Sequence, residues 1–343
     1  MELIIKPTEA CNFKCTFCSS TDIDPAKAGL LDLEYVYKFL KRYPDTRTII
    51  VNGGDPLMVD PSYYWKLIEH LDEHNYPTNI SFTTNLWPFV VRPEKWVDLF
   101  RHPRMGVCTS FQFGKGRLKG DYSIFTVEDF WRVSNKMLEL VGYRPDFISV
   151  MTDEDEDMAI ENVLLAKQMG VVCKLNYAMA SGVQGSTYRL SKMYKTYIQI
   201  YEMGLADYED NTRQMMVRLQ GYATTCPQNR KCDENIRAMN PAGDYYSCGS
   251  FADDKDYPID FQKELDGEFF TPLQDAFELQ SLKASCFGCP MFEICNGCHK
   301  TVRDMKREGI AEQHCREMKE LAPKILEING LDPNLVTPYV DES

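Results

Sequence analysis

Apolar and polar positions in the first half of the chain follow two alternating periods. Short runs rich in β-branched and aromatic residues alternate with stretches in which apolar residues recur every three to four positions. The short runs predict strands at residues 3–6, 48–52, 80–84, 106–113, 147–151 and 171–177. The longer stretches predict helices at residues 32–42, 61–73, 93–101, 127–141 and 157–169. Repeated units of this kind predict an α/β fold, a partial (β/α)6 barrel whose active site lies at the carboxyl ends of the strands.

The pattern changes after residue 177. A loop is expected at 182–185, followed by helices at about 188–203 and 210–219. Beyond residue 222, cysteines crowd together with Gly, Pro and Asp, and too little periodicity remains for an ordinary core. A last helix at about 311–326 is expected to kink or break before Pro323. We therefore predict a barrel at 1–185, a helical bridge at 186–222 and a small metal-stapled domain at 223–343.

A cysteine motif follows the first predicted strand. Cys11, Cys15 and Cys18 have the spacing C-x3-C-x2-C. Three thiolates can hold three irons of a cubane cluster and leave the fourth iron open to a substrate or cofactor. A zinc site is the alternative, but zinc sites usually add a second cysteine pair or histidines, and the first histidine is His70. The motif, with Phe17 at its aromatic position, resembles that of the radical S-adenosylmethionine (SAM) superfamily, which implies a 4Fe-4S cluster that binds SAM.

Further segments agree with this resemblance. The run from Gly53 through Asp55 resembles the family's Gly-Gly-Glu-Pro segment, with aspartate replacing glutamate, although a plain turn is the alternative. Arg117 could pair with the SAM carboxylate or be a solvated loop charge. Tyr177 could line the adenine pocket or pack in the core. The resemblance implies this set of SAM contacts: Phe17, Gly53, Gly54, Asp55, Thr84, Asn85, Ser110, Gln112, Arg117 and Tyr177.

A second cysteine group lies near the C-terminus. Its spacings, C-x10-G-x4-C followed by C-x2-C-x5-C-x2-C, resemble the SPASM extension of radical SAM enzymes, which carries two auxiliary 4Fe-4S clusters. The family's second block usually ends C-x3-C, so this chain is one residue short at Cys298. Two structural zinc sites are the alternative. The resemblance implies one cluster on Cys226, Cys232, Cys248 and Cys298, and a farther one on Cys286, Cys289, Cys295 and Cys315. The remaining Cys108 and Cys173 are expected to be small buried residues.

The composition of the chain argues against several classes of function. The net charge of −13 argues against a nucleic-acid or anionic-membrane binder. The sequence contains no apolar run long enough to span a bilayer and no secretory segment. Thirteen cysteines in such a chain indicate metal or redox chemistry rather than disulfides. We therefore expect a cytoplasmic protein of an anaerobic or low-oxygen host.

The resemblance also implies a chemistry. One electron cleaves SAM and yields a 5′-deoxyadenosyl radical, which abstracts hydrogen from an unactivated C–H bond. Our leading hypothesis is a radical SAM/SPASM oxidoreductase that cross-links, desaturates or otherwise oxidises a peptide or protein. A dehydrogenase or epimerase of a small metabolite is the alternative, and a non-catalytic iron–sulfur redox sensor is a third hypothesis. Expected partners are the substrate, a ferredoxin- or flavodoxin-type electron donor and a separate peptide-presenting protein.

One departure from the family bears on the reaction. Anaerobic sulfatase maturases carry an aspartate base immediately after the cysteine that matches Cys248, but Gly249 and Ser250 follow it here. This difference disfavours formylglycine formation by the same route. The sequence identifies no general base and does not name the substrate.

Overall fold

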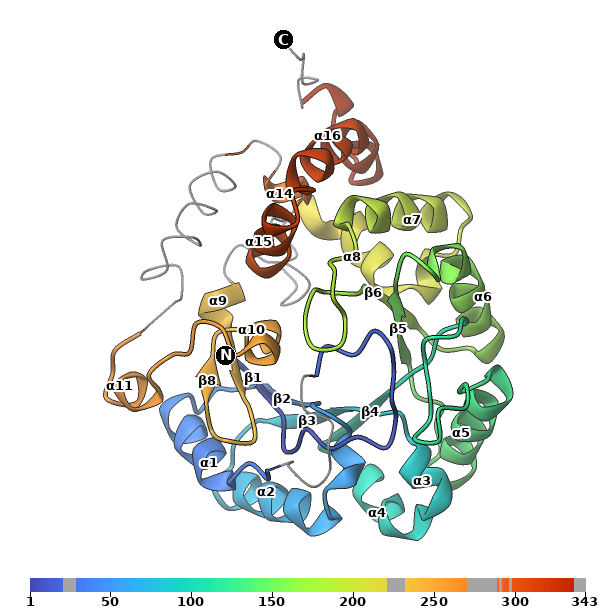
Figure 1. Ribbon diagram of the computed structural model, residues 1–343. Coiled ribbons are helices and arrows are strands. Elements are labelled where there is room, and N and C mark those ends of the chain that lie inside the picture. Colours follow the sequence, from blue (N-terminus) through green and yellow to red (C-terminus); the bar gives the residue numbers. More distant parts are fainter. Residues whose placement is uncertain (21–28, 221–231, 270–288, 290–291, 296–297, 336–343) are drawn as a thin grey trace. The chain divides into compact units, whose positions relative to one another are not determined.

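The computed structural model describes residues 1–20, 29–220, 232–269, 289, 292–295 and 298–335 (Figure 1). The chain divides into two compact units, and each is described by itself. The first unit comprises Met1–Ile148, Ser181–Val183 and Asp233–Pro272, and the second comprises Ser149–Ala180, Gln184–Cys232 and Leu273–Ser343. The organisation into residues 1–185, 186–222 and 223–343 stays a prediction.

A mostly parallel sheet forms the centre of the first unit. Its strands are β1 (Glu2–Ile5), β2 (Thr48–Val51), β3 (Asn79–Thr83), β4 (Met105–Ser110), β7 (Ile236–Met239) and β8 (Tyr245–Tyr246). β1 pairs in parallel with β2 on one side and with β7 on the other, so a strand from late in the chain lies beside the first. β2, β3 and β4 continue in parallel order, and β8 runs antiparallel to β7. The predicted α/β fold on a parallel sheet is confirmed.

Helices α1 to α5 lie on the outer side of these strands (Figure 1). Sequence signals fix their starts: Asp32 caps α1, Asp60 caps α2 ahead of Pro61, and Thr126 forms a capping box with Asp129 at α5. The helical elements of this unit are α1 (Leu33–Arg42), η1 (Pro56–Met58), α2 (Pro61–Glu73), α3 (Trp87–Val91), η2 (Pro93–Lys95), α4 (Val97–Phe100), α5 (Val127–Leu140), α10 (Gly249–Asp254) and α11 (Phe261–Leu265).

A buried polar cluster joins the late strands β7 and β8 to other elements of the same unit. Arg237 of β7 is fully buried, and its Nε donates to the carboxylate of Glu264 on α11 at 3.0 Å. The hydroxyl groups of Tyr43 and Tyr245 donate to the same carboxylate, each at 2.7 Å. Because a buried charge is tolerated only when it is paired and hydrogen-bonded, this cluster holds β7, β8, α1 and α11 together.

The second unit is mainly helical. The division between the units falls within β5 (Phe147–Met151), whose first residues pair with β4 in the first unit, and β6 (Cys173–Tyr177) lies beside β5. Glu209 accepts hydrogen bonds from the backbone of β6 and of the first turn of α8, and so ties the two together. The helical elements here are η3 (Glu156–Met158), α6 (Ala159–Met169), α7 (Leu190–Glu202), η4 (Ala206–Tyr208), α8 (Asp210–Val217), η5 (Arg218–Gln220), α14 (Phe292–Cys295), α15 (His299–Arg307), α16 (Ala311–Ile328) and η6 (Pro333–Leu335), and α9 (Cys232–Asn235) crosses the boundary in sequence.

The structure corrects two predictions of secondary structure. The helix expected at 93–101 is two short pieces, η2 and α4, joined through Trp96. Of the kink or break expected before Pro323, the break is wrong: α16 continues through the proline to Ile328. Met318, Ala322, Ile325 and Leu326 are all buried, so apolar packing on both sides of the proline outweighs the backbone hydrogen bond that it removes. Among the described residues, no helix combines the length and the apolar character needed to cross a bilayer.

Candidate functional site

The N-terminal cysteine loop directly follows β1 and is held by an antiparallel partner. Lys14 N donates to Leu118 O at 2.8 Å, and Thr16 N donates to Gly116 O at 2.9 Å. Cys11, Cys15 and Cys18 are half-buried, and the three thiols lie close enough for their charges to interact. The structure therefore brings together the three cysteines of the motif.

Burial controls the ionisation of these thiols. It raises the pKa of Cys11, and the nearby Asp55 carboxylate raises it further. Burial also raises the pKa of Cys18, while the Ser20 backbone N–H, Arg117 and Lys6 act in the opposite direction. Buried thiols become thiolate ligands when positive charge compensates them, and iron supplies such charge. Three thiols are the donor type of a 4Fe-4S cluster, although the structure does not arrange the three sulfurs as a formed metal site, and the ligand role of each residue stays a prediction.

Arg117 brings four of the predicted SAM contacts together. Its Nη1 donates to Ser110 Oγ at 2.9 Å, its Nη2 donates to Gln112 Oε1 at 2.8 Å, and its guanidinium lies 5.2 Å from the centre of the Phe17 ring. Only 5% of Arg117 is exposed, so it is not a solvated loop charge. Burial lowers the pKa of Arg117, and the three cysteines raise it. A buried cation thus lies beside the cysteine loop, where an anionic ligand group would find a bidentate partner.

The segment after β2 packs tightly on the cysteine loop. Gly53 has φ +118°, and a Cβ added there would lie 2.5 Å from Thr8 O. A Cβ added to Gly54 would lie 2.1 Å from Ala10 O. These contacts are too short for any side chain, so both glycines are required by the close approach of two backbones. The predicted Gly53–Gly54 contact segment therefore lies directly against the start of the cysteine loop.

Asp55 is buried and serves as an internal acceptor. Its Oδ1 accepts from Leu57 N at 2.9 Å, its Oδ2 accepts from Asn85 N at 2.8 Å, and Thr84 Oγ1 donates to both oxygens. Burial raises the pKa of Asp55 to about 6 despite these donors. Asn85 Nδ2 in turn donates to Asn12 Oδ1 at 2.8 Å. The ends of β2 and β3 and the cysteine loop are thus joined through predicted site residues.

Lys6 is a buried charged residue near the cysteine loop that the sequence interpretation missed. It follows β1, its side chain is 4% exposed, and it forms an ion pair with Asp253 of α10. Burial lowers the pKa of Lys6 to about 8, while Glu9, Cys18, Cys248 and Asp254 raise it, so this lysine lies near cysteines of both predicted groups. Cys248 itself caps α10, with Sγ accepting from Ser250 N at 3.4 Å. A lysine at the end of an apolar strand was the available signal.

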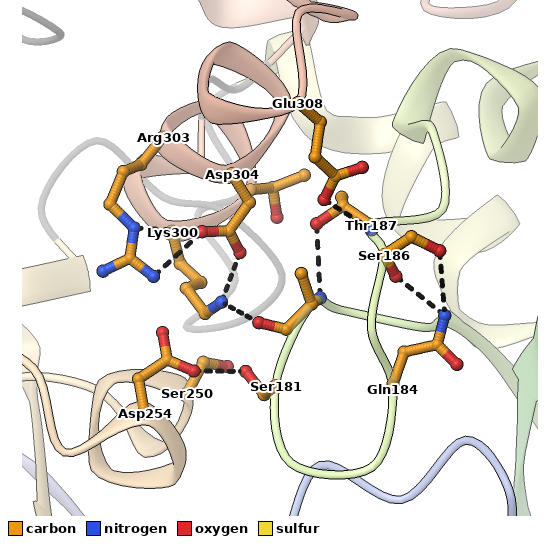
Figure 2. Close-up of polar contacts among 12 residues, drawn as sticks. Ser181, Gln184, Ser186, Thr187, Ser250, Asp254, Lys300, Arg303, Asp304 and Glu308 are labelled. Carbon is orange, nitrogen blue, oxygen red and sulfur yellow. Dashed lines mark hydrogen bonds and ion pairs between the residues drawn. The ribbon is translucent and has the colours of Figure 1, made fainter.

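A second carboxylate of α10 also has a partner. Ser181 Oγ donates to Asp254 at 2.5 Å (Figure 2). Asp253 and Asp254 therefore both have polar partners and are not simply solvated acids. Each is fixed by a residue that follows a strand, and both belong to α10, which begins directly after Cys248.

In the second unit, α15 packs against the chain that follows β6. Tyr177 is buried and its hydroxyl lies 2.9 Å from Thr301 Oγ1. Lys300 Nζ donates to Ala180 O at 3.1 Å and pairs with Asp304, which Arg303 also contacts (Figure 2). Tyr177 therefore packs within this unit, and its contact with adenine stays a prediction.

The later cysteines are described in part. Cys248, Cys289, Cys295 and Cys298 are half-buried, and Cys315 is exposed. Cys226 and Cys286 lie outside the described residues, as does the side chain of Cys232. In the part of the chain that the structure describes, no cluster of three or more His, Cys, Asp or Glu side chains is arranged to hold a metal ion. The two auxiliary ligand sets stay predictions. Of the other cysteines, Cys173 is buried and Cys108 is half-buried.

Comparisons with known proteins agree with this geometry. A family model described as the radical SAM superfamily matches residues 5–184, just over half of the chain. Polyhistidine-tagged anSMEcpe with bound AdoMet has a TM-score of 0.69 at 19% identity, covering 99% of this chain and 96% of that one. Native anSMEcpe with bound AdoMet and the Cp18Cys peptide gives 0.69 at 17% identity, with 96% and 98% covered.

A third solved structure covers less of its own chain. Streptococcus suis SuiB bound to the precursor peptide SuiA has a TM-score of 0.59 at 15% identity, covering 86% of this chain and 70% of that one. At these identities the likeness shows the fold. A search of curated proteins found no match.

Proposed function

The chain belongs to the radical SAM superfamily, and from this premise we propose that it oxidatively modifies a peptide or protein substrate. The observation that carries the proposal is the convergence of Cys11, Cys15 and Cys18 with the buried guanidinium of Arg117. The fold likeness supports the choice of substrate class, since anSMEcpe and SuiB were both solved with bound peptides. The modification would be a cross-link, a desaturation or a related C–H functionalisation.

Residues of the first unit would have different roles in the proposed site. Cys11, Cys15 and Cys18 would hold the 4Fe-4S cluster. When bound, the cluster and SAM supply a carbon radical able to abstract hydrogen from an unactivated C–H bond. Arg117 would bind the SAM carboxylate, because its guanidinium is buried and held in orientation by Ser110 and Gln112.

The remaining contacts orient the cofactor and exclude water. Gly53 and Gly54 would present their backbone to the methionyl amine, and Asp55 keeps this turn rigid by accepting from Leu57, Thr84 and Asn85. Phe17 covers the guanidinium of Arg117. Lys6, fixed by Asp253, would contribute a buried positive charge between the first cysteine loop and Cys248.

We further propose two auxiliary 4Fe-4S clusters on the later cysteines, which would take an electron from the oxidised substrate. The first would use Cys226, Cys232, Cys248 and Cys298. A ferredoxin- or flavodoxin-type protein would supply the reducing electron, and a separate protein would present the peptide. We propose that the protein acts as an oxidoreductase in the cytoplasm.

The test is anaerobic. The protein is reconstituted with iron and sulfide, reduced, and given SAM together with any short peptide encoded beside its gene. Mass spectrometry then follows 5′-deoxyadenosine and the peptide mass. We expect deoxyadenosine and a peptide lighter by two hydrogens. Cys11→Ala should abolish both products, and Cys108→Ala, which alters a cysteine outside the motif, serves as the matched control.

Other outcomes would revise the proposal. Deoxyadenosine with an unchanged peptide would support the radical chemistry and would favour a small metabolite as the substrate. If protein shown to carry its clusters made no more deoxyadenosine than Cys11→Ala, the catalytic assignment would fail and a redox-sensor role would take its place.

A further inference from the structure

A short hairpin packs against the cysteine loop in the first unit. Its residues, 114–125, follow β4, and Lys119 N donates to Ser123 O at 2.8 Å across the turn. Leu118 and Ile124 form an antiparallel bridge, and Lys119 forms a second antiparallel bridge with Phe13 of the cysteine loop. The 114–125 hairpin is therefore joined to the cysteine loop by backbone pairing.

The cysteine loop reaches the surface beside this hairpin. Thr16 is exposed, whereas Phe13 and Phe17 on either side of it are buried. Thr16 N donates to Gly116 O at 2.9 Å, so this exposed threonine lies next to the hairpin. Thr16 directly follows Cys15 in the motif. A molecule bound over Thr16 would therefore be adjacent to the predicted cluster ligands.

Lysines border the exposed threonine, although the chain as a whole carries a net charge of −13. Lys115 is exposed and Lys14 is half-buried, and among the residues that the structure describes neither forms an ion pair. The charge farther along the hairpin is compensated, because Lys119 pairs with Asp129 at 2.9 Å and also lies near Asp121. Two uncompensated positive charges thus lie at the point where the cysteine loop is exposed.

The tip of the hairpin adds exposed apolar surface. Tyr122 is 69% exposed and Ile124 is 41% exposed. Tyr122 also has φ +66°, a left-handed conformation that is rare for a bulky residue. Tyrosine is enriched among the residues that contribute most to binding at protein interfaces. An exposed tyrosine beside unpaired lysines therefore indicates contact with another protein.

We propose that Thr16 and the 114–125 hairpin form the docking surface for a small acidic one-electron carrier of the flavodoxin or ferredoxin type. The proposal rests on the proposed function, which needs an external electron at the cysteine loop. Charge complementarity selects this occupant, because carriers of this type are acidic and Lys14 and Lys115 attract them, whereas the acidic remainder of the chain repels them. The reduced carrier would lose one electron to the cysteine site, and no other reactant is needed.

The hairpin would then serve both the cofactor and the carrier. Arg117 is buried beside the cysteines, whereas Lys115, two residues earlier, is exposed to solvent. Contacts between redox proteins are small and transient, so a surface of this size is sufficient. Because lysines supply the attraction, we expect the affinity for the carrier to fall as ionic strength rises.

The experiment uses the whole chain, reconstituted with iron and sulfide, and oxidised flavodoxin as the probe. Isothermal titration calorimetry compares wild type, Lys115→Glu and Tyr122→Asn, since asparagine tolerates the left-handed conformation and removes the ring. Lys38→Glu, at an exposed position of α1, makes the same charge change away from the hairpin and is the matched control. We expect each hairpin variant to bind flavodoxin about 10-fold more weakly, and the control to bind as wild type does.

A second measurement separates docking from catalysis. Deoxyadenosine formation is followed once with reduced flavodoxin below saturation and once with dithionite, a small reductant that needs no docking surface. Lys115→Glu and Tyr122→Asn should form deoxyadenosine about 10-fold more slowly with flavodoxin and at the wild-type rate with dithionite. A ferredoxin in place of flavodoxin should rank the variants in the same order.

Three results would overturn the proposal while leaving the proposed function intact. One is equal flavodoxin affinity in wild type and both hairpin variants. Another is a wild-type dimer, measured by light scattering, that Tyr122→Asn converts to a monomer, which would assign this surface to a second copy of the chain. The third is an equal loss of deoxyadenosine with both reductants, which would make the hairpin part of the cysteine site. By contrast, wild-type protein that makes no deoxyadenosine with dithionite would remove the proposed function and this inference together.

Discussion

Cys18 in the first unit lies near two buried cations, whereas Cys295 in the second unit lies against a buried imidazole, that of His314. Arg117 and Lys6 act on Cys18, and each cation is held by oxygen partners of its own. The Sγ of Cys295 lies 3.4 Å from Nε2 of His314. The difference matches the proposed roles, because a cluster that binds the carboxylate group of SAM gains from fixed positive charge beside it, whereas an electron-transfer cluster binds no cofactor.

Replacing Cys18 and Cys295 in turn should have the largest effects on activity. Cys18→Ala is expected to lower SAM cleavage at least about 1,000-fold, a barrier increase of about 4 kcal/mol, because one iron loses its thiolate. Cys295→Ala should stop peptide oxidation while deoxyadenosine still forms. Liquid chromatography with mass spectrometry measures both products. Equal loss of deoxyadenosine in the two variants would show that the sites are not functionally separate.

Removing the buried cation of the first site should have the next largest effect. Arg117→Met is expected to weaken SAM binding by about 10- to 100-fold, since the charged group proposed to pair with the SAM carboxylate is lost. Lys115→Met, two residues earlier on the same loop but exposed, is the matched control and should bind SAM as wild type does. Equilibrium binding of SAM to the reconstituted protein measures the effect. Similar affinities in the two variants would remove Arg117 from the proposed site.

Two buried carboxylates, one in each unit, give a finer test of the proposed SAM site. Both are carboxyl groups with similar surroundings, but only one lies beside the cysteine loop. Burial raises the pKa of both Asp55 and Glu209 to about 6, and both accept backbone N–H groups. Asp55→Asn and Glu209→Gln should each cost about 1–3 kcal/mol of unfolding free energy, because an amide NH2 then meets a donor. Only Asp55→Asn should also weaken SAM binding. Urea unfolding and SAM titration measure the two effects, and an equal loss of affinity in Glu209→Gln would contradict the assignment.

The smallest expected effect is a pH dependence. Because the pKa of Glu209 is raised from 4.5 to about 6 on folding, the folded state binds more protons than the unfolded state between these values. The stabilising contribution of the protonated acid is complete below about pH 4.5 and is lost as pH rises through about 6. This loss amounts to about 2 kcal/mol. Urea unfolding of wild type and Glu209→Gln across this range should show a shallower slope in the variant, and parallel slopes would argue against the raised pKa.

Local signals predicted most of the first unit. β1 to β4 and helices α1, α2 and α5 follow their apolar periods, and caps such as Asp32 and Thr126 mark where helices begin. α3 was missed because its five residues include Pro88 and two valines, which do not form a helical pattern. β7 was missed because Arg237 interrupts its apolar run, and its partner Glu264 lies 27 residues further along the chain.

The residues of the candidate site were likewise predictable from the sequence only in part. The cysteine motif and the residues at the ends of β2, β3 and β4 were visible because each follows a predicted strand. The Lys6–Asp253 pair joins positions 247 residues apart, and neither residue type is diagnostic by itself. The neighbours of Cys295 depend on how α7, α14 and α16 pack, and no spacing in the sequence reports this.

The position of β1 has a consequence for synthesis on the ribosome. β1 is made first, yet one of its edges is covered only by β7, and the Lys6 backbone donates to Met239 O. About 230 residues separate the two strands. At about 5–20 residues per second, that edge stays open for roughly 10 to 50 s while the chain emerges. The strand that leads into the cysteine loop therefore gains its last neighbour only late in synthesis.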